Sequence, residues 1–378
     1  MTSALPATMH AWRKHRGIDE PIWEEVPVPS VPATGFLCKM LAAGVCHSDE
    51  AILVDRSPRR PWFQDKFTLG HEGCGEIIAI GEKVTDKSFK VVCQKPHIYH
   101  PSPSSSSSKL TPSKGDIIAM IAGPGCGHES CHECSHSLPQ LCATGHHSGI
   151  GQDGYFAPYA SIDQRGAALV PNTITPGIAA AATDAVLTAY HAVVRRAQVQ
   201  PHETVFIFGL GGLGFNGMQV CRAIGARVIV SDVREERLHA AKEFGVQDVV
   251  PVGKDIREFV KERGLEGKID TTIDFVGVEQ TFADAQAIVR AAGKLVCVGT
   301  LAAENTIQMK TCVRNRLSIL FSYGGNIEDL KEALDLIAQG KLKPQVESGR
   351  LEDFPKWLKD LCDGKVKGRV ALTCEHLS

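Results

Sequence analysis

Cysteine, histidine and acidic side chains gather in two short motifs early in the chain. The first motif reads Cys46-His-Ser-Asp49 and the second Gly70-His-Glu72. Thiolate and imidazole ligands suit the borderline-soft Zn²⁺ ion, and a third protein ligand would leave a fourth position open for a substrate oxygen. The two motifs therefore predict a catalytic metal site that contains Cys46 and His71.

A glycine-rich turn further along the chain predicts a dinucleotide-binding site. It follows the apolar run at residues 204–208 and opens a helical pattern that ends near residue 224. Glycines in this context permit a tight turn and bring backbone N–H groups at a helix N-terminus close to a pyrophosphate. We expect the cofactor contacts at Gly209, Gly211, Gly212, Leu213 and Gly214.

The acid that follows this turn bears on the choice of cofactor. Asp232 closes the next apolar run, about twenty residues after the turn, where a carboxylate can accept hydrogen bonds from a ribose hydroxyl. Asp232 would also repel a 2′-phosphate, which favours NAD over NADP, whereas the nearby Arg234 weakens this preference. A zinc site and a nicotinamide site in one chain together predict zinc-assisted hydride transfer.

Length and composition are those of an enzyme with about two domains. The chain has 378 residues, of which 43% are hydrophobic and 22% charged, and its formal charge of -2 gives no electrostatic reason to bind nucleic acid or an anionic membrane. No signal-peptide pattern and no apolar run of about 18 residues is present, so we expect a cytoplasmic protein that acts on small molecules. The 13 cysteines indicate metal binding and free thiols rather than disulfides.

Hydrophobic patterning predicts an α/β protein with two kinds of sheet. Short alternating runs at residues 35–41 and 75–81 are typical of a small barrel or sandwich. Alternation of apolar strands with helical patterns then predicts a parallel sheet covered by helices on both faces. Its strands are expected at residues 204–208, 227–231, 270–275, 294–298 and 318–322. A helix at 328–340 and a strand at 368–373 are expected to return to the first domain.

Two segments do not fit this pattern. Residues 92–114 contain a serine run and have no periodicity, so we interpret them as an insertion, either a surface loop or a mistranslated gene segment such as a retained intron. The glycines of Gly149-Ile-Gly-Gln-Asp-Gly154 match the dinucleotide pattern, but no apolar strand precedes them and no helix follows. We expect a loop there, with His146 and His147 either lining the substrate cleft or exposed to solvent.

These motifs, taken together along nearly the whole chain, resemble those of the zinc-containing medium-chain alcohol dehydrogenases. The resemblance rests on the two motifs above, a cysteine cluster, the glycine-rich turn and Lys367-Gly-Arg369. It implies a mostly-β GroES-like catalytic domain at residues 1–171, a Rossmann NAD-binding domain at 172–322, a return to the catalytic domain at 323–378, and a catalytic zinc in the cleft between them.

The resemblance also implies roles for individual residues. The third zinc ligand falls at Asp184, for which a helix N-cap is the alternative interpretation. Glu72 corresponds to an acid beside the metal, and Ser48 to a hydroxyl that relays the substrate proton. Some members continue that relay with a histidine where this chain has Ala51, so the proton would leave through the cofactor ribose, water or another side chain. Two further positions belong to the cofactor site: His47, with surface packing as its alternative, and Arg369.

A structural zinc site is expected at residues 124–144. The family pattern is matched by Cys131, Cys134 and Cys142, whereas the spacing before them is two residues too long. Either Cys126 completes the set through a bulged loop, which we favour, or His128 replaces it. An empty or oxidised cluster is a further alternative.

The resemblance implies a reversible reaction between a primary or secondary alcohol and NAD, in a homodimer or homotetramer. A zinc-free quinone or enoyl reductase using NADPH and a noncatalytic dinucleotide-binding relative are the alternatives. Trp62, Phe63 and Tyr155 are expected either to shape an apolar substrate pocket or to belong to the core.

Overall fold

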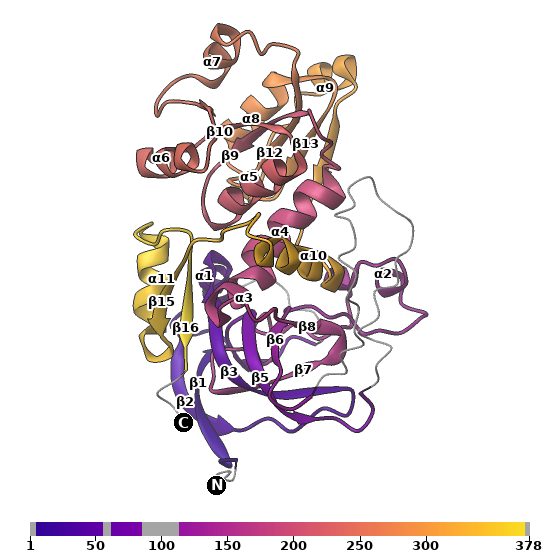
Figure 1. Cartoon of the computed structure of the whole chain (residues 1–378), viewed down its shortest axis with the longest axis vertical. Helices are drawn as coiled ribbons and strands as arrows, with labels where there is room; N and C mark the ends of the chain where they lie inside the picture. Colours follow the sequence, from indigo (N-terminus) through magenta and orange to yellow (C-terminus); the bar gives the residue numbers. More distant parts are fainter. Residues whose placement is uncertain (1–4, 56–61, 85–112, 375–378) are drawn as a thin grey trace.

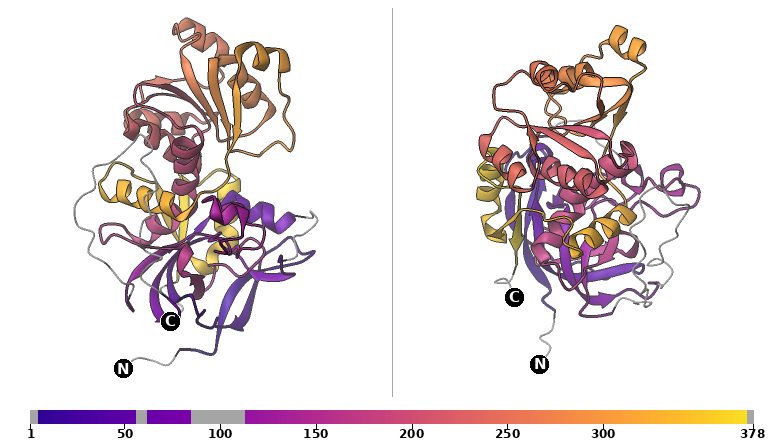
Figure 2. Two further views of the ribbon diagram at one scale, coloured as in Figure 1. Left: turned by 90° about the vertical axis from the view of Figure 1, so that its right-hand side faces the viewer. Right: turned by 45° about the horizontal axis from the view of Figure 1, so that its top comes forward.

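Two lobes make up the part of the chain that the computed structural model describes, which is residues 5–55, 62–84 and 113–374. Figure 1 shows a mostly-β lower lobe and an upper lobe in which helices surround a sheet, and Figure 2 shows the same division from two other sides. The chain crosses from the lower to the upper lobe near residue 196 and returns after the last strand of the upper sheet.

The lower lobe is built on a seven-stranded sheet. Its path runs β15-β16-β3-β5-β6-β8, and β7 pairs with β3. The bounds are β3 (Gly35–Val45), β5 (Glu72–Ile80), β6 (Ile117–Met120), β7 (Tyr159–Asp163), β8 (Ala167–Leu169), β15 (Val346–Arg350) and β16 (Arg369–Thr373). A small sheet of β2 (Ile22–Pro27), β1 (Thr8–His15) and β4 (Lys66–Thr68) lies beside it. Because β16 pairs with β3, the end of the chain joins the same sheet as its first third.

The upper lobe is a parallel six-stranded sheet in the order β11-β10-β9-β12-β13-β14. Its strands are β9 (Thr204–Phe208), β10 (Arg227–Ser231), β11 (Asp248–Val249), β12 (Ile269–Asp274), β13 (Val289–Cys297) and β14 (Ser318–Phe321). Its helices are α5 (Gly212–Ile224), α6 (Glu235–Glu243), α7 (Ile256–Glu262), α8 (Glu279–Ile288) and α9 (Met309–Asn315). This is the doubly wound order, in which ligands bind where the strand order reverses, here between β9 and β12. The predicted parallel sheet is confirmed, and β9 and β10 have the predicted bounds.

A long helical run connects the lobes. It consists of α3 (Pro176–Ala181), the π-helical turn η4 (Ala182–Val186), α4 (Leu187–Tyr190) and the π-helical turn η5 (His191–Arg196). The first turns pack on β3, β5 and β16, and the last on α5. The run is apolar and long enough to cross a membrane, but 78% of its 18-residue apolar window is buried inside the protein, as in a core helix.

The remaining helices and turns belong to the lower lobe or pack against the connecting run. They are α1 (His47–Val54), α2 (His132–Ser135), α10 (Ile327–Ala338) and α11 (Phe354–Cys362), with the 3-10 turns η2 (Pro139–Leu141), η3 (Gln164–Gly166) and η6 (Leu351–Asp353). Helix α10 packs on the connecting run, and α11 packs on α1. Residues 149–154 lie in a loop, as predicted, with a turn at residues 149–151. Of the insertion predicted at 92–114, only residues 113 and 114 lie in the described part. The domain boundaries at 171/172 and 322/323 stay predictions.

Candidate active site

The site begins where β3 ends and α1 starts. Cys46 occupies the N-cap of α1 and is 5% exposed. Its backbone N–H donates to Asp49 Oδ2 over 2.9 Å, which fixes the turn that directs the thiol. Gly44, near the end of β3, lets this strand lie close to β5, because a Cβ atom on Gly44 would lie 2.0 Å from Glu72 Oε2.

The strand beside it supplies the imidazole. His71 precedes β5 and is 4% exposed, and its Nδ1 lies 3.2 Å from Asp49 Oδ1. Burial alone would lower the pKa of His71, but the Asp49 carboxylate raises it well above its usual value. A carboxylate on one ring nitrogen orients the other nitrogen for a metal. Asp49 is a supporting residue that the sequence analysis missed, although its place three residues after Cys46 was a usable signal.

Asp184 comes from the helical run between the lobes. It lies within the π-helical turn η4 rather than at a helix N-cap, and such turns are frequent at functional sites. Its Oδ2 is 3.4 Å from Cys46 Sγ, and its Oδ1 accepts a 3.0 Å hydrogen bond from Thr188 Oγ1. The fold thus joins two residues that are 138 positions apart in the chain.

Arg369 holds the carboxylates of this group. Its Nη2 donates to Asp184 Oδ2 over 2.6 Å and lies 2.9 Å from Glu72 Oε1. Burial raises the pKa of Glu72 well above its usual value, and Arg369 only partly offsets this. Glu72 is fully buried behind the ligand atoms, where the Arg369 guanidinium is its charged neighbour.

The donor set fits a zinc ion. Ligand atoms of Cys46, His71, Glu72 and Asp184 all lie within 4.8 Å of one another. With zinc–ligand bonds of about 2.0–2.3 Å, tetrahedral geometry needs ligand atoms less than about 4 Å apart, and the 3.4 Å between sulfur and carboxylate meets this. Cys46, His71 and Asp184 are therefore the residues that would hold the ion, with Glu72 behind them.

The same group opens onto a large cavity. The cavity has a volume of about 790 Å³ and is bordered by Cys46, Ser48, His71 and Asp184. Ser48 Oγ lies 3.5 Å from Cys46 Sγ, so a hydroxyl stands beside the thiol at the cavity wall. All five predicted cofactor residues of the glycine-rich turn border the same cavity, namely Gly209, Gly211, Gly212, Leu213 and Gly214.

The glycine-rich turn has the geometry that its residues require. Gly209 has a φ of 82°, and a Cβ atom on Gly214 would lie 1.8 Å from the Gly209 carbonyl oxygen. Asp232 Oδ2 accepts a 2.6 Å hydrogen bond from the Leu210 N–H and lies 3.4 Å from Arg237 Nη1. The Asp232 carboxylate, which is predicted to bind the ribose, therefore lies beside the glycine-rich turn.

The guanidinium group of Arg369 lies close to the N-terminus of α5. A Cβ atom on Gly212 would lie 3.4 Å from Arg369 Nη1, so this guanidinium reaches from the carboxylates to the helix N-terminus. His47 borders the cavity, and burial and then Arg369 lower its pKa. Arg234, the residue that weakens the preference for NAD, donates to the Gly364 carbonyl and also borders the cavity.

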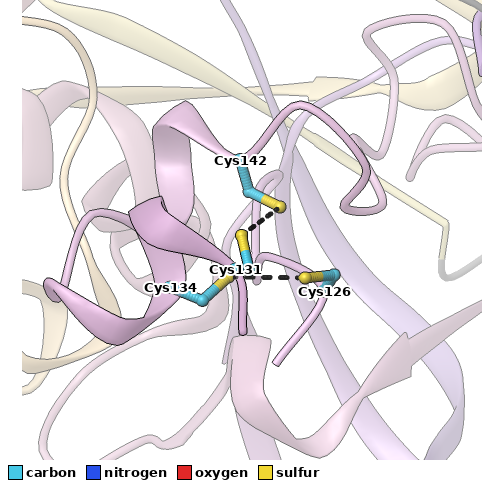
Figure 3. Close-up of side chains that lie close together, drawn as sticks. All are labelled: Cys126, Cys131, Cys134 and Cys142. Carbon is cyan, nitrogen blue, oxygen red and sulfur yellow. Dashed lines mark hydrogen bonds between the residues drawn. The ribbon is translucent and has the colours of Figure 1, made fainter. Parts of the chain in front are cut away.

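Four cysteines form a second group, shown in Figure 3. The Sγ atoms of Cys126 and Cys134 are 3.8 Å apart and those of Cys131 and Cys142 are 3.7 Å apart. All four sulfurs lie within 4.8 Å of one another, and this group does not include His128. Burial would raise the pKa of Cys142, but hydrogen bonds from Thr144 and Cys126 lower it to about 6, whereas burial raises the pKa of Cys134.

The loop histidines and the aromatic residues divide between cavity and core. His146 is exposed, whereas His147 is 7% exposed, borders the cavity and stacks on Trp62 with ring centroids 4.4 Å apart. His147 Nε2 donates to the Cys142 carbonyl over 2.9 Å. Tyr155 is fully buried and donates to the Ile121 carbonyl, so it is a core residue and does not shape the pocket.

Comparison with known proteins agrees with this arrangement. Residues 33–99 match the alcohol dehydrogenase GroES-like domain, and residues 212–339 match the zinc-binding dehydrogenase family. An NAD-dependent alcohol dehydrogenase of Sulfurisphaera tokodaii is 30% identical over 92% of this chain and 95% of its own length. An alcohol dehydrogenase of a Moraxella species is 28% identical over 92% and 94% of the two chains.

Solved structures show the same fold. Acetophenone reductase of Geotrichum candidum, solved in complex with NAD, aligns with a TM-score of 0.82 at 29% identity and covers 98% of this chain and 99% of its own. The alcohol dehydrogenase of Aeropyrum pernix aligns with a TM-score of 0.81 at 26% identity, over 97% and 100% of the two chains. The alcohol dehydrogenase relatives, together with the GroES-like lobe and the Rossmann sheet, support an oxidoreductase of the alcohol dehydrogenase type. The chain belongs to the zinc-containing medium-chain alcohol dehydrogenase family.

Proposed function

We propose that this chain is a zinc-dependent dehydrogenase that transfers a hydride reversibly between a primary or secondary alcohol and NAD, giving an aldehyde or ketone. The observation that carries the proposal is the meeting of two sites in one cavity. Cys46, His71 and Asp184 border it on one side, and the turn from Gly209 to Gly214 borders it on the other. Substrate and nicotinamide can therefore lie in contact.

Residues of this chain can position the metal, accept the substrate proton and bind the cofactor. When bound, zinc acts as a Lewis acid that lowers the pKa of a coordinated hydroxyl. Ser48 places a hydroxyl beside Cys46, where it can accept the substrate proton and pass it on. His47 and Arg369 lie near the N-terminus of α5, where cationic and N–H groups favour the pyrophosphate.

NAD is the proposed cofactor because of Asp232. Its carboxylate borders the cavity and would repel a 2′-phosphate, and the cationic Arg237 already pairs with it. The NAD-dependent relative from Sulfurisphaera tokodaii supports the same choice.

The test is metal analysis of the purified full chain together with a panel of alcohols, each assayed with NAD and with NADP. We expect one or two zinc ions per chain and alcohol-dependent formation of NADH, abolished by a chelator and restored by zinc. A zinc-free protein that reduces enones or quinones with NADPH would overturn the proposal in favour of a zinc-free reductase. Cofactor binding without turnover of any substrate would indicate a noncatalytic relative.

We also propose the homodimer or homotetramer expected from the family, with contacts at the edge of the upper sheet. β14 ends the strand order, and Phe321 on it is 67% exposed, as is Val313 on the neighbouring α9. Apolar side chains at a sheet edge favour pairing with a second copy. Light scattering of the wild-type protein should give a mass that is a multiple of the chain mass. Phe321→Lys should lower that mass, and a monomeric wild-type protein would refute the proposed assembly. The cytoplasmic location stays a prediction.

A further inference from the structure

A threonine four residues beyond Asp184 holds one of its two carboxylate oxygens. Thr188, on α4, is 6% exposed, and its Oγ1 donates to Asp184 Oδ1 over 3.0 Å. A threonine hydroxyl inside a helix ordinarily donates to a backbone carbonyl three or four residues earlier. Thr183 follows this rule, because its Oγ1 donates to the Ala180 carbonyl over 2.7 Å. Thr188 departs from it, since its hydroxyl binds the side chain of a metal ligand.

The two oxygens of Asp184 have different surroundings. Oδ2 lies 3.4 Å from Cys46 Sγ and accepts from Arg369 Nη2 over 2.6 Å, whereas Oδ1 accepts the Thr188 hydrogen bond. An ionised carboxylate oxygen has two acceptor positions, so Oδ2 can accept from Arg369 and still ligate an ion. The Oδ2 atom, which contacts the thiol, is therefore the one that fits the metal site.

The number of oxygens that Asp184 offers decides whether the metal site stays open. A carboxylate can ligate a cation through one oxygen or through both. Three protein ligands that offer one atom each leave a fourth tetrahedral position for a substrate oxygen. A second oxygen from Asp184 would compete for that position. A hydroxyl that keeps Oδ1 engaged therefore prevents the protein from filling the place of its own substrate.

We propose that Thr188 is a positioning residue that holds Asp184 Oδ1, so that only Oδ2 ligates the catalytic zinc and the fourth position stays open for the alcohol oxygen. The inference rests on the proposed function, in which Asp184 is a ligand of that ion. The placement of Thr188 suits this role, because Thr188 and Asp184 lie on one continuous helical run and both border the cavity. A β-branched side chain also has few rotamers within a helix, which keeps the hydroxyl in place.

The first test is the crystal structure of the wild-type protein with zinc bound. We expect Asp184 Oδ2 at about 2.0–2.2 Å from the ion, the usual length of a zinc–carboxylate bond. Oδ1 should lie beyond bonding distance of the ion and should still accept the hydrogen bond from Thr188. Ligation through both oxygens, or through Oδ1 alone, would overturn the inference.

The second test measures whether the fourth position is free. Imidazole, a neutral nitrogen ligand for zinc, is titrated calorimetrically into the zinc-loaded protein without cofactor. Thr188→Val keeps the branched shape and removes the hydroxyl, so the affinity for imidazole should fall about tenfold or more while the zinc content stays unchanged. A factor of this size is expected when a hydrogen bond to a charged group is lost. The kcat/KM for hexan-1-ol with NAD should fall by a similar factor.

Two further variants separate positioning from packing. Thr188→Ser keeps the hydroxyl and should restore most of the imidazole affinity. Thr183→Val, which removes a buried hydroxyl from the same helical run but leaves Asp184 Oδ1 paired, is the matched control and should bind imidazole as the wild type does.

Three results with these variants would overturn the inference. The first is an unchanged imidazole affinity in Thr188→Val, and the second is an equal loss in Thr183→Val and Thr188→Val. The third is loss of zinc from Thr188→Val, because the hydroxyl would then retain the ion rather than keep a position open. If Thr188→Val does not fold, the wild-type structure with zinc decides alone.

The outcomes also separate this inference from the proposed function. A protein without zinc at Cys46, or one that oxidises no alcohol with NAD, fails the proposed function. A zinc enzyme that oxidises hexan-1-ol with NAD, and in which Asp184 ligates through both oxygens, fails only the assignment of Thr188.

Discussion

The two groups of potential metal ligands differ in chemistry and in surroundings. Cys46, His71 and Asp184 combine a thiol, an imidazole and a carboxylate at the wall of a cavity. The second group consists of four thiols on a short lobe, three of them partly exposed, and none borders the cavity. A mixed set that faces a cavity leaves a position for substrate, whereas four thiolates close a tetrahedral site. The contrast teaches that openness and donor type together separate a catalytic site from a structural one.

The supporting residues differ in the same way. Carboxylate and guanidinium groups hold the first set, with Asp49 on His71 and Arg369 on Asp184. Backbone turns hold the second, as where the Cys131 N–H donates to the His128 carbonyl. Variants in the first group should therefore affect the reaction, and variants in the second should affect stability.

Cys46→Ser should have the largest effect. Loss of the thiolate removes the catalytic metal, and with it several kcal/mol of transition-state stabilisation, so kcat/KM should fall by about 10³-fold or more. Metal analysis should show one zinc ion fewer per chain. Cys312→Ser, which replaces a thiol on α9, is the matched control and should retain activity and zinc. Full alcohol oxidation by Cys46→Ser would show that the catalytic assignment is wrong.

Ser48→Ala should have the next largest effect. Without the hydroxyl beside Cys46 the substrate proton has no acceptor at the wall, and general acid–base groups contribute about 10²–10⁴-fold to rates. Steady-state kinetics should show a fall in kcat with zinc content unchanged, and Ser48→Thr should restore most of the rate. Equal rates for the alanine and threonine variants would exclude Ser48 from the relay.

Asp49→Asn should have a smaller effect, directed at the metal. The amide keeps the shape but no longer holds His71 through a charge, and such changes cost about 10–100-fold in metal affinity or activity. Competition with a chelator should show weaker zinc binding at one site only, and added zinc should recover part of the activity. Unchanged zinc affinity would mean that Asp49 serves only the backbone turn at Cys46.

Cys131→Ser should have the smallest effect on the reaction. Loss of the structural ion should lower Tm by about 5 °C or more and remove one zinc ion, because structural sites contribute folding energy. The kcat for hexan-1-ol should stay within about threefold of wild type, since no thiol of this group borders the cavity. Abolished turnover in a fully folded variant would remove the distinction between the two groups.

Sequence patterns predicted the parts of the molecule that depend on local geometry. The turn from Gly209 to Gly214 and the strands on either side of it could be read directly, because tight turns and buried parallel strands constrain nearby residues. The patterns also predicted the approximate location of the strands in the lower lobe. In the upper lobe, β13 begins at Val289, five residues before its predicted start. The tertiary role of Tyr155 could not be settled, because pocket and core aromatics have the same composition.

Residues that act across the chain were harder to predict. Asp184 was inferred only from family resemblance, because the π-helical turn that directs it to Cys46 leaves no clear pattern in the sequence. Thr188 was missed, since an ordinary polar residue acquires a role only when the fold buries it at a cavity, here beside Asp184. For His147 the sequence left two interpretations, a residue of the cleft or an exposed one, and the structure buries it against Trp62 at the cavity.

Anomalous diffraction at the zinc absorption edge, from crystals of the purified full chain, tests the central claim most directly. The account predicts one peak about 2.0–2.3 Å from Cys46 Sγ, the Nε2 of His71 and a carboxylate oxygen of Asp184, and a second peak among the four thiols. An active alcohol-oxidising protein with zinc only at the four thiols, and none at Cys46, would contradict it.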